Sequence, residues 1–445
     1  MRVFISGIGL VSPLGIGREH NWQAFLNSVT HVEDIPGEWR QYADFLTTIW
    51  SPLPDFDYSA LGFRRTEVLQ HDPASLLALI SVKEALDDAG VIYEQKDLKK
   101  NNYILSDIDT NTVTVNYGAS FGGGSSFIDA HSYHQVSKIK KKLAQSPVDD
   151  ISAVADSLHC LRRFNPFAVS MILGNMVPAS IAMKYSIHGK VVPVVQACSS
   201  GTTAVGYAAN QIKQGEFQMA ISGGVEYTKD SYGTCFYGFD IARTMVDSEK
   251  YENKTRACRP FDEDRSGLLY AEGGTATLIL ESEEHLERRG GEPIAEIIGF
   301  GETFDAYSIM APDPSGVQIE RMMRMALDDA DIAPGDVDYV NAHGTGTIAN
   351  DKTEAGVIER VFGKNVAVNS TKSIIGHTFG ASGAIEAAVC ALSLRDQELH
   401  PSLNLENPIA DLNFVTERRK AKLKYALSES FAFGGHNSGL VFKAV

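Results

Sequence analysis

The run VVPVVQACSSGTTAVGYAANQIKQG, residues 191–215, joins a β-branched segment to a small-residue helix through a cysteine. Val191–Val195 favours a strand, and the apolar residues after Gly201 favour a helix that ends at Gly215. Cys198 lies at the junction, where the free N–H groups and partial positive charge of a helix N-terminus favour a thiolate over a thiol. The alternative for a single cysteine is a small buried hydrophobe, and two histidine motifs described below favour the reactive thiol.

The composition is that of a globular protein with an acidic balance. The 445 residues include 56 acidic and 40 basic side chains, a net charge of −16, and 44% are hydrophobic. A general nucleic-acid binder needs a basic face, so we expect no nucleic-acid partner. The chain also has no apolar run of about 18 residues, the length that a transmembrane helix requires, so we expect no membrane span.

The cysteines bear on the compartment of the protein. They are widely spaced and form no Cys-x-x-Cys pair, and the five are Cys160, Cys198, Cys235, Cys258 and Cys390. An odd number without close pairs argues against a disulfide framework and against a structural zinc site. We therefore expect a reducing compartment, the cytoplasm, and no bound metal.

Four short similarities, in the same order in two parts of the chain, indicate a duplicated unit. They pair residues 4–9 with 296–301, residues 85–89 with 326–330, the strand ending at Asn116 with the strand ending at Asn341, and the helix after Cys198 with the helix after His377. Because strands alternate with helices, each unit is expected to form a mainly parallel α/β layer. The sequence thus predicts two similar α/β halves packed on each other, with Cys198 and His377 at related helix starts.

The Gly290-Gly291 pair is the best candidate for a boundary between these halves. We predict an N-terminal half over residues 1–290, which carries an insertion at about residues 131–163, and a C-terminal half over residues 291–445.

Two of the 12 histidines lie in motifs that suit a substrate site. His343, in VNAHGTGT, follows an apolar strand and precedes glycines, and His377, in NSTKSIIGHTFGASG, precedes a helix start. Small neighbours at the ends of strands and loops let a substrate approach. A cysteine with two histidines serves either a protease-like site, in which one histidine is the base, or carbon–carbon bond formation.

The protease alternative needs an asparagine or aspartate to orient the base, and it leaves the second histidine motif and its lysine without a role. In carbon–carbon bond formation, the thiolate takes an acyl group as a thioester. Two neutral imidazoles then donate hydrogen bonds to the carbonyl of a second thioester and stabilise the enolate that forms when its carboxylate leaves as CO₂. The carbanion attacks the acyl-cysteine, and this chemistry uses the whole motif set.

Together the motifs resemble those of elongating β-ketoacyl-[acyl-carrier-protein] synthases of type II systems, in the thiolase-like superfamily. The similarity runs almost end to end, through ISGIGLVSPLG, ACSSG, RPFDEDRSG, NAHGTGT, STKSIIGH and SFAFGGHNSG, and it is weakest over residues 30–60 and 131–163. It implies a thiolase-like α/β fold, with two pseudo-symmetric βαβ-rich halves packed as a five-layered αβαβα core. Two histidine motifs with a lysine between them favour the elongating Cys-His-His type over the priming Cys-His-Asn type.

The resemblance implies a role for each motif residue. Cys198 is the acylated nucleophile, and its backbone N–H and that of Phe433 form the oxyanion hole. His343 and His377 bind the malonyl thioester carbonyl and promote decarboxylation, and Lys372 is the lysine of the site. Phe433 also resembles the gate between the acyl and malonyl sides.

The resemblance extends to less specific positions. Glu354 is expected to pair with His343, and the alternative is an exposed helix acid. Phe239 matches an aromatic residue of the acyl pocket, and the alternative is a core phenylalanine. Three arginines match positions that present positive charge to an acidic carrier protein: Arg64, Arg65 and Arg243. For them the alternative is an exposed side chain without a partner.

Three features depart from the family pattern. The gate loop usually reads Phe-Gly-Phe-Gly-Gly, whereas this chain has Ala432 at the first glycine, and alanine disfavours a positive φ at a hinge. His436 stands where many members have threonine, and residues 131–163 form an unusual insertion. These differences indicate a specialised relative with altered gate motion, acyl pocket or carrier docking.

The implied function is decarboxylative Claisen condensation of a cysteine-bound acyl group with malonyl-acyl-carrier protein. The product is β-ketoacyl-acyl-carrier protein, in fatty acid or type II polyketide or polyene biosynthesis. The alternative is the active ketosynthase subunit of a heterodimeric minimal polyketide synthase. A thiolase would need a second cysteine near the C-terminus, and none follows Cys390; a non-catalytic chain-length subunit would lack Cys198.

The implied partners are an acyl carrier protein, whose phosphopantetheine arm brings the substrate, and a second subunit, either identical or homologous. No further cofactor is implied. Family dimers pair through the strand before the nucleophile, and Pro193 would interrupt that pairing locally because it has no N–H to donate.

Overall fold

The computed structural model describes residues 1–149, 151, 154–155 and 164–445. Its main sheet is built from two sets of strands. The N-terminal set is β1 (Val3–Ser12), β7 (Val113–Gly118), β8 (Val191–Val194), β9 (Met219–Tyr227) and β10 (Gly273–Ser282). The C-terminal set is β11 (Ala295–Phe304), β12 (Tyr339–Asn341), β13 (Ala367–Asn369), β15 (Asn413–Phe414), β17 (Tyr425–Phe431) and β18 (His436–Lys443).

The two sets of strands pair in the same pattern. In the first, β1 runs antiparallel to β10, β10 antiparallel to β9, and β7 parallel to both β9 and β8. In the second, β11 runs antiparallel to β18, β18 antiparallel to β17, and β12 parallel to both β17 and β13. The sets meet where β1 pairs with β11, through Phe4 with Glu296 and Ile5 with Ala295. This repeated order is the arrangement expected of a duplicated unit.

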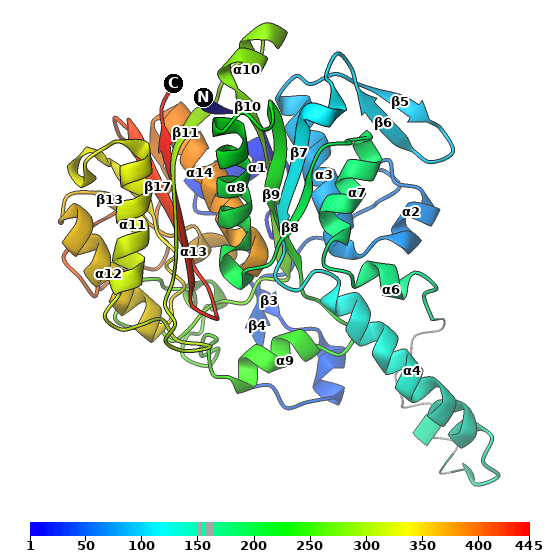
Figure 1. The fold of residues 1–445 in the computed structure, drawn as a ribbon. Helices are drawn as coiled ribbons and strands as arrows, with labels where there is room; N and C mark the ends of the chain where they lie inside the picture. The colour runs from blue at the N-terminus through cyan, green and yellow to red at the C-terminus, as the bar shows by residue number, and fades with distance from the viewer. Residues whose placement is uncertain (150, 152–153, 156–163) are drawn as a thin grey trace.

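Helices cover both faces of each set (Figure 1). The central pair is α8 (Ser200–Lys213) and α14 (Ser382–Asp396), which contact each other and strands of both sets. On the outer face of the first set lie α3 (Pro73–Asp88) and α7 (Met176–Tyr185), and on the outer face of the second lie α11 (Val317–Ala330) and α12 (Ile348–Phe362). The result is the five-layered αβαβα core that was expected.

Shorter elements surround this core. The remaining helices are α1 (Arg18–Leu26), α2 (Arg65–Gln70), α4 (Gly124–Ala144), α6 (Ala168–Met171), α9 (Thr234–Ile241), α10 (Glu283–Arg289) and α13 (Lys372–Ile375). The remaining strands are β2 (Gly15–Ile16), β3 (Glu33–Asp34), β4 (Ile49–Trp50), β5 (Tyr93–Asp97), β6 (Asn102–Leu105), β14 (Glu398–Leu399) and β16 (Arg419–Lys420). None of the helices in the described ranges is long and apolar enough to cross a membrane.

Local sequence signals set the ends of several helices. α3 begins where the Asp72 side chain accepts a hydrogen bond from the backbone N–H of Ala74 at 2.8 Å, with Pro73 at the first helical position. α10 begins at the Ser282 cap and ends at Gly290, whose φ of +69° suits glycine. Both helices therefore begin where the local sequence carries a cap residue.

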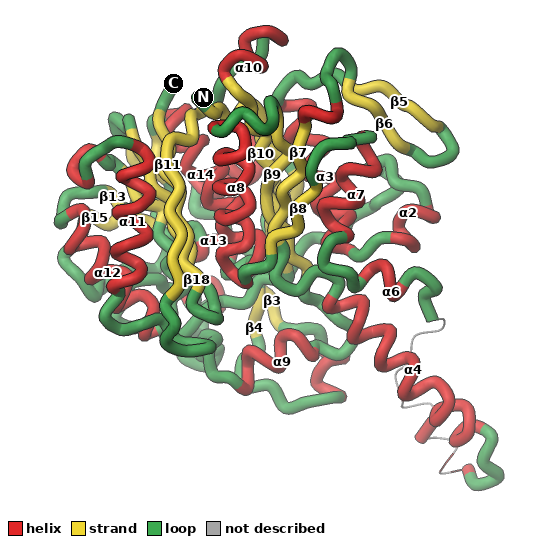
Figure 2. Tube along the Cα trace, in the orientation of Figure 1, coloured by secondary structure: helices red, strands yellow, loops and turns green. Residues whose placement is uncertain are grey.

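The segment expected to be an insertion begins inside α4. This helix runs without a break over Gly124–Ala144 and projects away from the body of the molecule (Figure 2). Its outer end carries Lys141 and Lys142. The rest of the expected insertion lies largely outside the described residues, as does Cys160.

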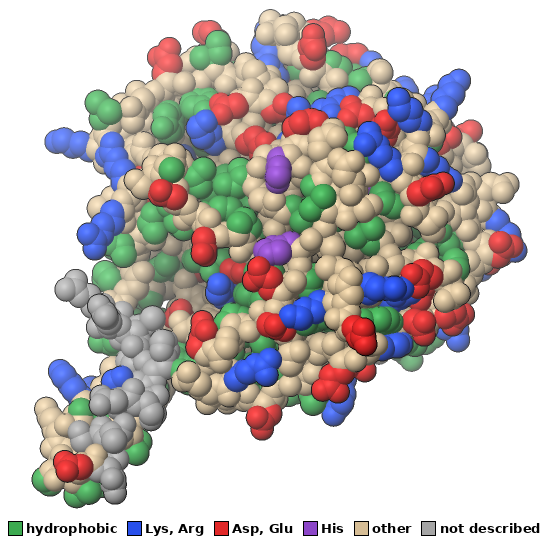
Figure 3. Space-filling view, turned by 180° about the vertical axis from the view of Figure 1, so that it is seen from behind, with side chains coloured by type: hydrophobic (Ala, Val, Ile, Leu, Met, Phe, Trp, Pro, Cys, Tyr) green, Lys and Arg blue, Asp and Glu red, His purple; other side chains and the backbone are tan. Residues whose placement is uncertain are grey.

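On the face seen in Figure 3, acidic and basic side chains are interspersed over the body of the molecule.

Close packing of the two central helices predicts a strong effect of one added methyl group. A Cβ on Gly201 of α8 would lie 2.7 Å from the backbone N and 3.0 Å from the Cβ of Ala384 in α14. Gly201→Ala should therefore lower the free energy of unfolding by about 1–3 kcal/mol. Urea unfolding measures this change, and Gly238→Ala in α9 is the control because a Cβ there meets nothing within 4 Å. Equal stability of the two variants would contradict the packing.

Candidate active site

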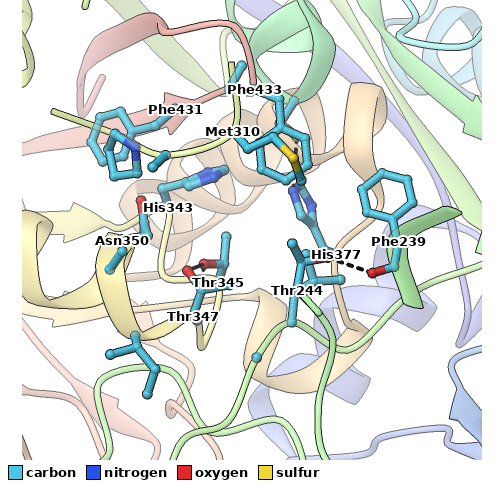
Figure 4. A pocket seen from close by; sticks show the side chains of 18 of the residues that line it. Phe239, Thr244, Met310, His343, Thr345, Thr347, Asn350, His377, Phe431 and Phe433 are labelled. Carbon is cyan, nitrogen blue, oxygen red and sulfur yellow. Dashed lines mark hydrogen bonds between the residues drawn. The ribbon is translucent and has the colours of Figure 1, made fainter. Parts of the chain in front are cut away.

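A cavity of about 280 Å³ opens between the two halves of the molecule. Cys198 reaches it from the start of α8, and His343 and His377 reach it from the C-terminal half. Figure 4 shows both imidazoles projecting into this cavity, with Phe433 close to His377. The structure therefore brings the cysteine and both histidine motifs to one place.

Cys198 and His377 are held by similar turns. Cys198 lies in the short 3₁₀ turn η3 (Ala197–Ser199), directly before α8, and His377 lies shortly before the turn η6 (Phe379–Ala381) that leads into α14. The residue before each has a positive φ, +45° at Ala197 and +73° at Gly376. A left-handed alanine is strained, and such strain is typical of functional sites. These kinks turn both side chains into the cavity.

Burial determines the protonation of the nucleophile. It raises the pKa of the Cys198 thiol to about 12, although Lys372 and the backbone N–H groups of Phe433 and Cys198 act in the opposite direction. A charged sulfur loses its solvation in this cavity, and the helix terminus does not offset that loss. Burial therefore opposes the resting thiolate that the helix terminus alone favours.

This pKa gives a prediction for alkylation. The rate of iodoacetamide addition to Cys198 should rise about tenfold per pH unit between about pH 7 and pH 10, because only the thiolate reacts. Peptide mass spectrometry of quenched samples measures it, with Cys198→Ala to assign the adduct. A plateau in rate near neutral pH would show a thiolate at rest and contradict the burial argument.

The His377 ring has one tautomer that fits its surroundings. Its Nε2 lies 3.1 Å from the Cys198 sulfur. Its Nδ1 accepts a hydrogen bond from the backbone N–H of Phe379 at 3.2 Å and lies 2.9 Å from the Ser382 hydroxyl. Because Nδ1 is an acceptor, the ring proton resides on Nε2. His377 therefore presents an N–H donor to the sulfur and to the cavity.

His343 has the same tautomer for a different reason. The Lys372 ammonium, which can only donate, lies 3.3 Å from Nδ1 of His343, so Nε2 carries the proton. Burial, with the nearby charge of Lys372, lowers the pKa of both histidines well below its usual value. Their ring centroids are 5.5 Å apart. The cavity thus holds two neutral imidazoles with N–H donors.

Buried acids support these two histidines. Glu354 accepts hydrogen bonds from the backbone N–H groups of His343 at 2.6 Å and Gly344 at 2.9 Å. It therefore holds the backbone of His343 and not the imidazole. Glu386 lies 2.5 Å from the Lys372 ammonium. Sequence reasoning missed Glu386, although an acid in the apolar run GAIEAAVCAL was a signal for it.

A third buried acid joins the two halves beside the nucleophile. Glu226 on β9 accepts hydrogen bonds from the backbone N–H groups of Ser120 at 3.0 Å and Gly380 at 3.2 Å. Burial raises its pKa to about 7. It connects the glycine-rich loop after β7 to the turn before α14, and sequence reasoning did not find it.

Aromatic side chains form one wall of the cavity. The Phe239 ring stacks on the Phe433 ring, with centroids 6.0 Å apart, and lies 4.9 Å from the ring of Phe379. Phe433 belongs to the turn between β17 and β18, whose positive φ angles, +92° and +95°, fall on Gly434 and Gly435.

Of the two unusual residues of this turn, Ala432 lines the cavity and His436 does not. Ala432 is not among the residues with positive φ, so its backbone is not strained. The His436 ring packs against Phe304 and does not line the cavity.

The three arginines expected to meet a carrier protein are not brought together. Arg243 is exposed and lines the cavity. Arg64 and Arg65 are exposed at the start of α2, away from the cavity lining, and Arg64 donates to the backbone carbonyl of Lys99 at 2.8 Å.

Metal-ligating side chains are not gathered in the described part of the chain. No group of three or more His, Cys, Asp or Glu residues there is arranged to hold a metal ion. The cysteines in the same part, Cys198, Cys235, Cys258 and Cys390, are free and buried.

Two family models match the sequence. One is the N-terminal domain of beta-ketoacyl synthase, over residues 1–285, and the other is its C-terminal domain, over residues 294–406. The chain belongs to the β-ketoacyl synthase family. A full-length relative, the 3-oxoacyl-[acyl-carrier-protein] synthase 2 of Coxiella burnetii, is 34% identical over 459 residues, which cover 100% of this chain and 99% of the relative.

Solved ketosynthases have the same fold. A chain of the AntDE:AntF complex, a type II polyketide synthase acyl-carrier protein with its ketosynthase bound to the hexaketide, matches with a TM-score of 0.83 and 25% identity. The ishigamide ketosynthase/chain length factor matches with a TM-score of 0.82 and 25% identity. Each match covers 100% of this chain and 99% of the other. The predicted family and the thiolase-like fold class are thus confirmed.

Proposed function

We propose that this β-ketoacyl synthase condenses an acyl group on Cys198 with malonyl-acyl-carrier protein and releases CO₂. The observation that carries the proposal is the cavity in which a cysteine lies 3.1 Å from a neutral imidazole and a second neutral imidazole lies beside the first. Two neighbouring N–H donors stabilise a developing enolate, whereas neither ring has the free Nε2 lone pair that a base toward the sulfur needs.

The first step loads the enzyme. The Cys198 sulfur attacks the carbonyl of an acyl thioester, a new S–C bond forms, and the carrier's thiol leaves with the proton that the cysteine loses. The backbone N–H groups of Cys198 and Phe433, which point at the sulfur, would stabilise the oxyanion of this step. Phe239, Phe379 and Phe433 provide apolar surface for an acyl chain.

The second step removes CO₂ from the malonyl group. The thioester carbonyl oxygen accepts hydrogen bonds from Nε2–H of His343 and of His377, and the carboxylate leaves as its C–C bond breaks. The electron pair moves into the enolate, whose charge the two donors stabilise. Lys372, through Nδ1 of His343, keeps the proton of that ring on Nε2.

The third step forms the new carbon–carbon bond. The enolate carbon attacks the acyl-Cys198 carbonyl, the oxyanion forms again, and the S–C bond breaks to release the sulfur as a thiolate. The thiolate takes up one proton from the solvent, and the β-ketoacyl product leaves on its carrier. A phosphopantetheine arm on the carrier fits the role of delivering both substrates, and no other cofactor takes part in these steps.

The carrier and a second subunit are part of the proposal. Arg243 at the cavity mouth is the arginine best placed to meet an acidic carrier, and Arg64 and Arg65 would provide a separate basic contact. Edge strand β8 and its surroundings carry exposed apolar side chains, including Val195 and Met183, which suit burial against a homologous or identical subunit.

We place the boundary between the duplicated halves after residue 290. We also propose that the protein works in the cytoplasm, where its buried free thiols would stay reduced.

A second candidate is the active subunit of a heterodimeric polyketide synthase. The likeness to the ishigamide ketosynthase/chain length factor favours it. A thiolase remains a poor alternative, because Cys390 on α14 is buried and does not line the cavity.

The test of this proposal measures the carrier-bound products by mass spectrometry. The purified chain is supplied with acyl-carrier protein and then malonyl-carrier protein, alone and co-expressed with a homologous subunit. Elongation of saturated acyl groups by the chain alone supports the fatty acid role. Elongation that requires the homologous subunit supports the polyketide role. Absence of a β-ketoacyl product under both conditions overturns the proposed function.

A further inference from the structure

A second cavity, of about 510 Å³, lies in the N-terminal half and shares no lining residue with the cavity that holds Cys198. It is formed mainly by α2, the β5–β6 hairpin and the C-terminal part of α7, on the side of the first set of strands away from the C-terminal half (Figure 1). Its volume is within the range of small-molecule sites in proteins. The condensation steps use none of its lining residues.

The lining of this second cavity carries more positive than negative charge. It contains one acidic side chain, Glu67, and three lysines, Lys96, Lys100 and Lys184. The Lys184 ammonium lies 2.7 Å from the Glu67 carboxylate, so this pair is neutral. In the described part of the chain neither Lys96 nor Lys100 forms an ion pair, and the Lys96 ammonium lies 3.3 Å from the Ser186 hydroxyl. Two positive charges are therefore left over, in a chain whose net charge is −16.

Two buried polar atoms belong to residues that line the same cavity. Ser180 lies on α7 and is 2% exposed, and Asn102 begins β6. Among the residues that the structure describes, the Ser180 hydroxyl and Oδ1 of Asn102 have no hydrogen-bond partner. A buried polar atom without a partner costs free energy, and a bound molecule that supplies the partner removes that cost. The cavity thus combines unpaired positive charge with unused hydrogen-bonding groups.

We propose that this second cavity binds a small phosphate monoester whose organic part carries hydroxyl groups. A phosphate monoester has three acceptor oxygens and a charge of about −1.5 to −2 at neutral pH, which matches the two free ammonium groups of Lys96 and Lys100. Oδ1 of Asn102 only accepts, so it needs a hydroxyl donor on the ligand, whereas the Ser180 hydroxyl can donate or accept.

The buried atoms favour a small molecule over the acidic surface of a protein. Lys96 and Lys100 are exposed and would meet either kind of partner. The Ser180 hydroxyl and Oδ1 of Asn102 are buried, so only a group that enters the cavity reaches them. Met183 also lines the cavity and belongs to the apolar surface that we propose faces a second subunit. The experiments therefore use the protein in the assembly that it forms in solution.

Isothermal titration calorimetry in a phosphate-free buffer tests the site, with glycerol 3-phosphate as the probe. This probe is expected to bind at one saturable site per chain. Inorganic phosphate and glycerol are each expected to bind about tenfold more weakly, because each lacks one of the two parts that the cavity contacts. Equal affinity for inorganic phosphate and glycerol 3-phosphate would contradict a ligand with an organic part.

Two neighbouring lysines provide a matched pair of variants. Lys100→Met is expected to weaken the binding of glycerol 3-phosphate about tenfold or more, because it removes a charged donor. Lys99→Met is the control, since Lys99 is also exposed but does not line the cavity. Its affinity for the probe should stay within about twofold of that of the natural protein.

Ser180→Ala is expected to separate binding from stability. Removal of a buried hydroxyl that has no partner removes a desolvation cost, so the melting temperature of the free protein should stay the same or rise. The binding of glycerol 3-phosphate should weaken about fivefold, because the ligand loses one hydrogen bond. A lower melting temperature with unchanged binding would show a purely structural serine and contradict the proposal.

Three further results overturn the proposal. One is the absence of saturable binding of glycerol 3-phosphate to the natural protein. Another is an equal loss of affinity in Lys99→Met and Lys100→Met, which would show a general attraction of anions to surface lysines. The third is condensation that Lys100→Met slows and Lys99→Met does not, without any binding of the probe, which would assign the cavity to the carrier protein. The binding and melting measurements do not depend on the proposed condensation.

Discussion

Cys198→Ala is expected to abolish acyl loading and condensation, with a loss of more than about 10³-fold in condensation rate. No other cysteine among the described residues lines the cavity, so none of them offers a second thiol to the acyl group. Decarboxylation of malonyl-carrier protein is expected to persist within about tenfold, because the two imidazoles that stabilise the enolate remain. Intact mass reports loading, and CO₂ release reports decarboxylation.

A matched cysteine provides the control for that result. Cys235 of α9 is buried and does not line the cavity, so Cys235→Ala should load and condense like the natural protein. Acyl mass that remained on Cys198→Ala would show that another residue is the nucleophile. Equal losses in the two cysteine variants would indicate a folding defect and not a missing nucleophile.

Replacement of either cavity histidine by alanine is expected to slow decarboxylation by about 10²–10³-fold, the effect of removing one donor to an oxyanion. The two variants should differ in loading. His343→Ala should load Cys198 normally, whereas His377→Ala removes the ring that lies 3.1 Å from the sulfur and should slow both steps. Separate assays of acyl loading and CO₂ release resolve the two effects.

His436→Ala is the control for the histidine pair. This ring packs on Phe304 outside the cavity, so its loss should change the rates by no more than about twofold. A large effect of His436→Ala on decarboxylation, with little effect of His343→Ala, would contradict the assignment of the two donors.

The reacting groups could be predicted from sequence because their signals are local. Cys198 follows a β-branched run and precedes a helix, and His377 precedes the equivalent helix in the second half. Such junctions expose a side chain at the end of a sheet whatever the details of packing. The duplication also predicted two similar halves, since each repeated motif falls on an equivalent strand or helix.

The environment of those groups could not be predicted, because it depends on residues far apart in the chain. The family resemblance implied Lys372 and Glu354, whereas Glu386 on α14 and Glu226 on β9 carry no local sequence signal that they meet the site. The effect of burial on the pKa of Cys198 could not be predicted either. The helix terminus favours a thiolate, but the desolvation that outweighs it comes from the whole cavity. Single arginines such as Arg64 gave no signal of where they lie relative to the cavity.

The most direct test of the central claim is a single turnover of acyl-loaded protein. The chain is loaded on Cys198, freed of excess acyl-carrier protein and mixed with malonyl-carrier protein. The account predicts that acyl mass leaves Cys198, CO₂ is released and β-ketoacyl-carrier protein appears, all in equal amounts and at one rate. Release of CO₂ while the acyl group stays on Cys198, or elongation by a protein that never carries it, would contradict the account.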